Sequence, residues 1–219
     1  MAETADGTAP ETGGAPAPQA ARTPRIGLVV VSTRPVRIGG QLGIQLTELI
    51  EKDHLGIEVV VIDLRALALP FLDEPQMASL GVYVHEHTRR WAATINSLDG
   101  IIFLTPQYNW GYPAPLKNAI DYLFAEWRGL PGLVVSYGTH GGTKCNDQIT
   151  QVLDRVGVEL VKPGVCVYVP KDAYGPDEHL LNPGAVLAPD TAEVNDRLAE
   201  LVTKARERAA SRDAVPDQG

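Results

Sequence analysis

The chain has 219 residues, enough for one α/β domain of ordinary size or, as the alternative, two small ones, and its 44% hydrophobic and 21% charged residues are typical of a soluble globular protein. The formal net charge of −8 argues against general binding to nucleic acid or anionic lipid, and no apolar run approaches the roughly 18 residues of a membrane span. Cys145 and Cys166 are too few and too far apart in sequence for a zinc site, so we expect no metal, no disulfide and a reduced, cytoplasmic location.

The two ends of the chain differ in composition from its middle. Residues 1–24 are rich in Ala, Pro, Gly and Thr and carry almost no large apolar side chain, so burial cannot offset the entropy of ordering them. The same holds for residues 211–219. We expect a disordered N-terminal arm, one domain over residues 25–210 and a disordered tail. The N-terminus has no apolar segment and is not read as a secretory signal.

Short runs rich in Val and Ile alternate with helical patterns through the domain. We expect strands at residues 26–31, 57–64, 100–104, 133–137 and 164–169, and helices at 40–53, 82–97, 114–128, 143–156 and 190–210. Most of the runs lack polar alternation, as in parallel strands that helices cover on both faces. The sequence therefore predicts an α/β three-layer sandwich whose ligands sit beyond the carboxyl ends of the strands.

The loop after the first strand combines hydroxyls, arginines and two glycines at the start of a helix: Ser32, Thr33, Arg34, Arg37, Gly39 and Gly40. Free backbone N–H groups, the helix dipole and a forked guanidinium favour an anion, and a phosphate monoester fits best. The loop is neither a Walker A motif nor a Gly-x-Gly-x-x-Gly motif. The alternative interpretation is a polar turn with solvated arginines.

The loop after the third strand packs three aromatics and three prolines into residues 105–115. Proline restricts the backbone and aromatic faces suit a flat conjugated ligand, with backbone groups available to its polar edge. The candidate residues are Pro106, Gln107, Tyr108, Asn109 and Trp110. The alternative is a hydrophobic lid or an oligomer contact.

The loop after the fourth strand is glycine-rich, Tyr-Gly-Thr-His-Gly-Gly-Thr over residues 137–143. Such a backbone must approach something closely or adopt positive φ. Its candidate site residues are Gly138, His140, Gly141 and Gly142. His140 could touch a ligand ring or substrate, or be a partly exposed loop histidine.

Three motifs together resemble the NADPH-dependent FMN reductase family, which includes quinone, azo-dye and chromate reductases. They are Val-Ser-Thr-Arg-Pro-Val-Arg from residue 31, Pro-Gln-Tyr-Asn-Trp-Gly-Tyr-Pro-Ala-Pro-Leu-Lys-Asn-Ala-Ile-Asp from residue 106, and Ser-Tyr-Gly-Thr-His-Gly-Gly from residue 136. The likeness spans roughly residues 25–200. The family usually has Gly at position 31 and Glu at position 107, and often an arginine or a small residue near position 140.

The resemblance implies a flavodoxin-like fold with a five-stranded parallel sheet in the order 2-1-3-4-5. It implies that Ser32, Thr33, Arg34 and Arg37 hold the phosphate of FMN, with the isoalloxazine between the second and third loops. NADPH or NADH would deliver hydride, and a small-molecule acceptor such as a quinone, flavin or azo compound would take it in a ping-pong cycle, with the flavin carrying the chemistry. A homodimer or homotetramer is also implied, with contacts around residues 71–84 and 116–127.

Two other classes of function remain open at this point. One is a flavin-binding redox sensor or partner-binding module without substantial turnover, and the other is a phosphoester-binding enzyme without flavin. Outside the three loops, we interpret His85 and His87 as part of a solvated helix face and Cys145 as a small surface residue. A catalytic role for the Asp73–Glu74 pair is not expected.

Overall fold

The computed structural model describes residues 22–213. Most of the predicted arm and tail, residues 1–21 and 214–219, therefore lies outside the described residues. Both predicted boundaries shift: Arg22–Pro24 lead into the first strand, and the last helix continues to Asp213 rather than ending at residue 210. Within the described part of the chain, no helix is long and apolar enough to cross a membrane.

A parallel sheet forms the middle layer, and its order β2-β1-β3-β4-β5 confirms the predicted topology. Its members are β1 (Arg25–Val30), β2 (Glu58–Asp63), β3 (Gly100–Pro106), β4 (Pro131–Gly138), β5 (Glu159–Leu160) and β6 (Val165–Tyr168). The predicted fifth strand at residues 164–169 is β6, which pairs with the end of β4, whereas the two-residue β5, which pairs with the start of β4, was not predicted as a strand of its own. Pro163, which has no N–H to donate, lies in the break between them.

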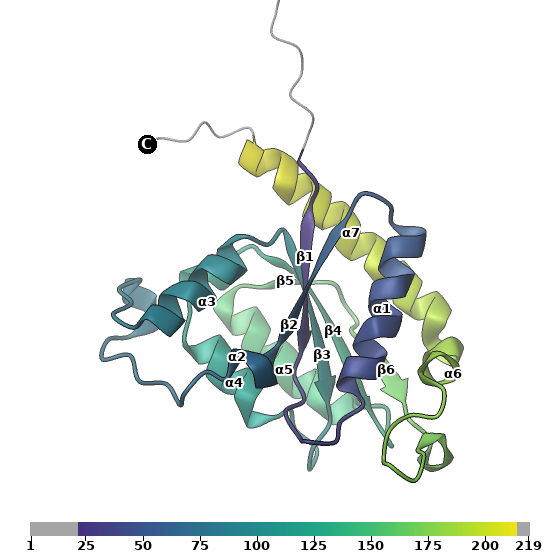
Figure 1. Ribbon diagram of the computed structural model, residues 1–219. Coiled ribbons are helices and arrows are strands. Elements are labelled where there is room, and N and C mark those ends of the chain that lie inside the picture. The colour runs from purple at the N-terminus through teal and green to yellow at the C-terminus, as the bar shows by residue number, and fades with distance from the viewer. Residues whose placement is uncertain (1–21, 214–219) are drawn as a thin grey trace, which may run out of the picture.

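Helices cover both faces of this sheet (Figure 1). On one face lie α1 (Gly39–Asp53), α6 (Pro183–Leu187) and α7 (Thr191–Asp213); on the other lie α3 (Glu86–Asn96), α4 (Ala114–Asp121) and α5 (Thr143–Val156). The predicted helices at 82–97 and 114–128 are shorter than expected. The short helices α2 (Leu64–Leu67) and α6 were not predicted, and residues 22–213 also contain four 3₁₀ turns: η1 (Ala78–Leu80), η2 (Ala125–Trp127), η3 (Lys171–Ala173) and η4 (Ala188–Asp190).

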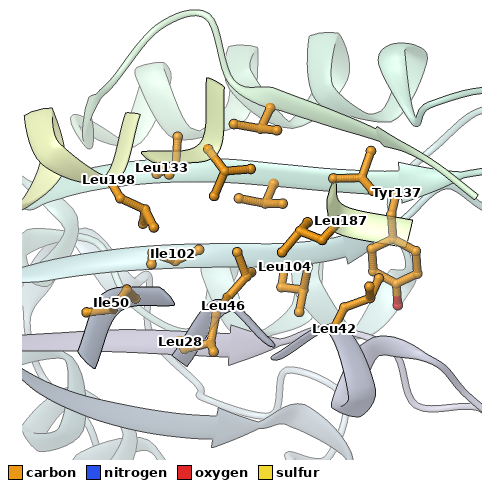
Figure 2. Packing of buried hydrophobic residues seen from close by; sticks show 14 of the residues in the cluster. Leu28, Leu42, Leu46, Ile50, Ile102, Leu104, Leu133, Tyr137, Leu187 and Leu198 are labelled. Atoms are coloured by element: carbon orange, nitrogen blue, oxygen red, sulfur yellow. The ribbon is translucent and has the colours of Figure 1, made fainter. Parts of the chain in front are cut away.

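The core is divided by the sheet, because successive side chains of each strand point to opposite faces. Leu28 and Ile102 pack toward α1 and α7, whereas their neighbours Val29 and Phe103 pack toward α3, α4 and α5. Figure 2 shows the first cluster, in which Tyr137 at the end of β4 lies beside Leu42 of α1. Burial on both faces explains why the strands read as continuous apolar runs.

The two ends of the described chain meet at the amino edge of the sheet. The guanidinium of Arg22 donates to the buried carboxylate of Asp99, which also accepts from the backbone N–H of Arg25 at 2.9 Å. The Nε of Arg22 donates to Asp213 at the end of α7, at 3.0 Å. These contacts hold both ends of the described chain at the amino ends of the strands, on the side of the sheet opposite the three predicted loops.

Candidate functional site

A cavity of about 510 Å³ opens at the carboxyl ends of β1, β3 and β4. Its lining includes six of the predicted site residues, namely Arg34, Arg37, Pro106, Gln107, Tyr108 and Gly138. It also includes four other residues of the same three loops, Val36, Ile38, Tyr137 and Thr139, and two from outside them, Tyr174 and Glu178. The fold thus brings the three loops together and adds a fourth wall from the chain after β6, which is the usual place for a ligand in this class of sheet.

The other predicted site residues lie around this cavity rather than in its lining. Ser32 is buried beneath the first loop and Thr33 is half-buried. The side chains of Asn109, Trp110 and His140 are exposed at the tips of the second and third loops. Gly141 and Gly142 are buried at the base of the third loop.

Two buried hydroxyls without hydrogen-bond partners meet beside the cavity. The hydroxyls of Ser32 and Tyr137 influence each other, but neither forms a hydrogen bond of normal geometry, although these residues are only 1% and 3% exposed. Both face the first residue of α1, because a Cβ built on Gly39 would lie 2.4 Å from the Ser32 Oγ and 2.7 Å from the Tyr137 hydroxyl. Unpaired buried hydroxyls are costly, so this arrangement suits a polar ligand that completes them.

The helix that starts here also leaves its first N–H groups available. The N-cap of α1 is Ile38, which makes no side-chain cap, and the first turn contains no acidic residue. Such a helix start carries partial positive charge. Burial raises the pKa of Tyr137, so its hydroxyl stays protonated near neutral pH and can donate. The geometry fits a phosphate group, which accepts several hydrogen bonds at once.

Arg37 is directed mainly away from this point, toward the end of β2. Its guanidinium forms a two-pronged pair with the Asp63 carboxylate, with one bond of 2.7 Å, and also donates to the carbonyl of Ser32. The hydrogen bond from Arg37 is the main reason that the pKa of Asp63 is lowered. Arg37 therefore holds the shape of the first loop, a role that the sequence did not predict for it.

We expect Arg37→Ala to lower the free energy of unfolding by about 2 kcal/mol at neutral pH, the usual scale for hydrogen bonds to a charged group. Because the folded pKa of Asp63 is depressed, its stabilising contribution is present above pH about 4 and is lost as pH falls through the folded pKa. Denaturant unfolding of both proteins at pH 7 and pH about 3 measures this difference, which should shrink in acid. Arg90→Ala, which removes an arginine whose ion pair with Glu86 is exposed and far from this loop in sequence, is the control. A difference that persists unchanged in acid would contradict the assignment.

The second loop folds into a two-residue hairpin. Tyr108 and Gly111 exchange backbone hydrogen bonds of 2.9 and 3.0 Å, and Asn109 and Trp110 between them have φ of 48° and 71°. This left-handed pair is the geometry of a tight hairpin turn. It leaves the Trp110 side chain 63% exposed, with the Lys144 ammonium 5.9 Å from its ring centre. An aromatic face with a cation beside it therefore stands at the rim of the site.

Gln107 fastens the second loop to α5. Its side-chain oxygen accepts from the N–H of Cys145 at 3.1 Å, which caps a helix whose N-cap, Gly142, has no side chain to do so. Cys145 itself is fully buried, so the prediction that it is a small surface residue was wrong. Burial raises the pKa of its thiol to about 11, and it is a free cysteine, as is Cys166. Its side chain packs into the fold because the start of α5 lies against β3.

The third loop turns through two left-handed glycines, Gly141 and Gly142, with φ of 69° and 73°. A Cβ on Gly142 would also lie 2.8 Å from Ser136 of β4, so the close approach that the sequence predicted is to the chain's own strand. Several backbone N–H groups expected near a ligand ring already donate within the protein, namely those of Gln107, Tyr108 and Gly141. The His140 ring is exposed and lies 3.3 Å from the Thr139 hydroxyl.

The segment before α3 forms a separate surface. His85 and His87 stack at 5.2 Å and both contact Asp73, so they are not a simply solvated helix face as predicted. The hydroxyl of Tyr122 donates to the same carboxylate at 2.9 Å, and the side chain of Asn118 holds Pro70 and Leu72 through their backbones. These side chains fix the segment beside an apolar groove of about 380 Å³ next to α4, apart from the main cavity.

The sequence did not indicate four features of the site: the Tyr137 hydroxyl, the close approach at Gly39, the Asp63 partner and the Glu178 wall. Tyr137 reads as the last apolar residue of a strand, and only its place in the sheet shows where its hydroxyl points. Among residues 22–213, no group of three or more His, Cys, Asp or Glu side chains could hold a metal ion.

Comparison with known proteins places this site in context. The sequence pattern of the NADPH-dependent FMN reductase family matches residues 24–173. The NAD(P)H-dependent FMN reductase LOT6 of Saccharomyces cerevisiae is 42% identical over 156 residues, covering 67% of this chain and 81% of the yeast protein. A quinone reductase of Pseudomonas putida is 34% identical over 133 residues, covering 58% and 64%. The solved structure of FerB, a flavoenzyme NAD(P)H:(acceptor) oxidoreductase from Paracoccus denitrificans, superposes with a TM-score of 0.64 at 21% identity, covering 84% and 98% of the two chains.

Proposed function

Because this chain belongs to the NADPH-dependent FMN reductase family, we propose that it binds FMN in the cavity at the end of the sheet and uses NAD(P)H to reduce a flat acceptor such as a quinone, a flavin or an azo compound. The observation that carries the placement is the pair of unpaired hydroxyls of Ser32 and Tyr137 at the start of α1. A phosphate there would accept from both hydroxyls and from the first N–H groups of the helix.

The residues that line the cavity then contribute to FMN binding in different ways. Arg34, whose side chain is 63% exposed, supplies positive charge to the phosphate, and Arg37 keeps the first loop in shape through Asp63. Burial raises the pKa values of Tyr108 and Tyr174, which keeps both side chains neutral and able to donate. FMN itself, when bound, supplies the two-electron chemistry between NAD(P)H and the acceptor.

The rim of the cavity receives the co-substrates in turn. Trp110 offers an exposed aromatic face, and Lys144 adds a cation beside it, which suits a flat anionic molecule such as a nicotinamide dinucleotide. Asn109 and His140 lie at the exposed tips of the loops on either side and provide the polar groups for ring and acceptor. One shared rim supports a ping-pong order, in which NAD(P)H leaves before the acceptor enters.

Steady-state kinetics test this function. The purified protein should copurify with or take up a flavin, and should oxidise NAD(P)H with menadione, free FMN or an azo dye as acceptor. Parallel double-reciprocal plots would support the ping-pong order, and converging plots would replace it with a ternary complex. A flavin-loaded protein without turnover on any of these acceptors would favour the redox-sensor function, and failure to bind flavin would favour a phosphoester enzyme without it.

We also propose a homodimer or homotetramer that assembles through residues 71–84. This segment exposes several large apolar side chains, including Phe71 at 88% and Met77 at 71%. Several exposed apolar side chains within one short segment favour a protein contact. The region 116–127 contributes less, because most of its apolar side chains are buried in the core. Sedimentation analysis that found only monomers would remove this proposal.

The free cysteines fit a cytoplasmic location.

A further inference from the structure

A short loop beyond the family match forms the fourth wall of the cavity. The match ends at residue 173, whereas Tyr174 and Glu178 both line the cavity. Tyr174 pairs with Leu180 in an isolated bridge, and Leu181 donates to the carbonyl of Ala173 at 2.9 Å. We call residues 174–181 the 174–181 loop. Its own hydrogen bonds give it a defined hairpin-like form.

The loop is fastened to α1 at one point. The side chain of Gln41 donates to the carbonyl of Leu180 at 3.1 Å and accepts from its N–H at 2.9 Å. The Leu180 side chain is buried in the core beneath this contact. The loop therefore sits beside the helix start where we place the phosphate. In Figure 1 it is the green loop below α6, next to the turn that precedes α1.

Glu178 stands at the tip of this loop and faces the phosphate site. It has a left-handed φ of 60°, uncommon for a residue with a side chain, and its N–H donates to Gly175 at 3.0 Å. Its carboxylate lies 3.9 Å from the Arg34 guanidinium, and both side chains are well exposed, at 71% and 63%. A carboxylate is thus held at the mouth of a site built for an anion.

Each arginine that lines the cavity already has a carboxylate as its ion-pair partner. Arg37 is paired with Asp63, and Arg34 has Glu178 as its ion-pair partner. The remaining titratable groups that face this point are Tyr108, Tyr137 and Tyr174, which burial keeps neutral. A phosphate arriving at α1 must therefore draw Arg34 away from Glu178 and then lie near a like charge.

From this arrangement we infer that Glu178 competes with the flavin phosphate for Arg34 and so weakens FMN binding, keeping the flavin exchangeable. The inference rests on the proposed function and identifies Glu178 as a residue that sets affinity rather than one that reacts. Exchangeable binding lets the chain release reduced FMN as a product, and it also lets FMN stay bound while other acceptors are reduced.

Flavin titration of the full-length chain freed of cofactor tests the inference. Glu178→Gln keeps the shape of the side chain and removes its charge, and should tighten FMN binding roughly 3- to 10-fold, as expected for one charge at this range in partly solvated surroundings. The dissociation rate of FMN should fall by a similar factor. The gain should shrink at high ionic strength, because salt screens exposed charges.

Two comparisons isolate the phosphate. Riboflavin lacks this group, so its affinity should be the same for wild type and Glu178→Gln. Asp172→Asn removes an equal charge from the neighbouring turn, which lines a different cavity, and should leave FMN affinity unchanged. Three results would overturn the inference and leave the proposed function standing: equal FMN affinity in wild type and Glu178→Gln, weaker binding in the variant, or an equal change for riboflavin. A wild-type chain that binds neither flavin would overturn the proposed function and the inference with it.

Discussion

Gly39→Ala is expected to reduce FMN affinity by about 100-fold or more, the combined scale of losing two hydrogen bonds to a charged group. The new Cβ would lie 2.4 Å from the Ser32 Oγ and 2.7 Å from the Tyr137 hydroxyl, closer than any real contact. Ser32 would have to rotate its hydroxyl toward the place of the phosphate, and the buried Tyr137 ring would have to shift. Flavin fluorescence titration measures the loss.

The neighbouring glycine gives a matched control. A Cβ on Gly40 meets nothing within 4 Å, and alanine favours a helix by up to about 1 kcal/mol over glycine. Gly40→Ala should therefore keep FMN affinity and should slightly raise the melting temperature. Equal flavin affinity in the Gly39 and Gly40 variants would show that the phosphate does not lie at the start of α1.

Tyr137→Phe should change stability and binding in opposite directions. Its hydroxyl is buried without a partner, so removing it should raise the free energy of unfolding of the flavin-free protein by about 1 kcal/mol. The same change removes a donor to the phosphate, and FMN affinity should fall about tenfold or more. Denaturant unfolding without flavin measures the change in the free energy of unfolding, and flavin titration measures the change in FMN affinity.

A purely structural role for Tyr137 would not produce this pair of results. Tyr112→Phe, which removes a half-buried hydroxyl lining another cavity, should leave FMN affinity unchanged. Riboflavin binding should be nearly equal in wild type and Tyr137→Phe. A more stable Tyr137→Phe protein with unaltered FMN affinity would mean that the hydroxyl never meets the ligand, and the phosphate would need another site.

Local patterns in the sequence were enough to predict the layers of the fold. The run Ile26–Val31 could be predicted as a strand from its composition, because a strand that is buried on both faces of the sheet needs apolar side chains throughout. Helix α5 was predicted with its observed bounds, because its apolar periodicity begins directly after the glycines at 141 and 142. The strand β5 was missed as a separate element, since it has only two residues, Glu159 and Leu160, and one of them is charged.

The site was harder to predict than the fold because its decisive contacts join distant parts of the chain. Arg37 was assigned to the phosphate from its place in the loop, but its partner Asp63 ends another strand. Cys145 looked exposed in sequence because its neighbours are polar, yet it lies on the face of α5 that packs on the sheet. Glu178 belongs to a stretch without regular structure, and only folding shows that it reaches the cavity.

The meeting of Arg22 with Asp213 has a practical consequence for handling this protein. The described chain begins and finishes at one place, on the edge of the sheet opposite the cavity. A fluorescent domain or an affinity handle attached directly at Arg22 or Asp213 would therefore start on the side away from the cavity. The same closeness allows Arg22 and Asp213 to be joined by a short linker and the chain to be opened elsewhere, which would yield a circularly permuted reductase with its pocket intact.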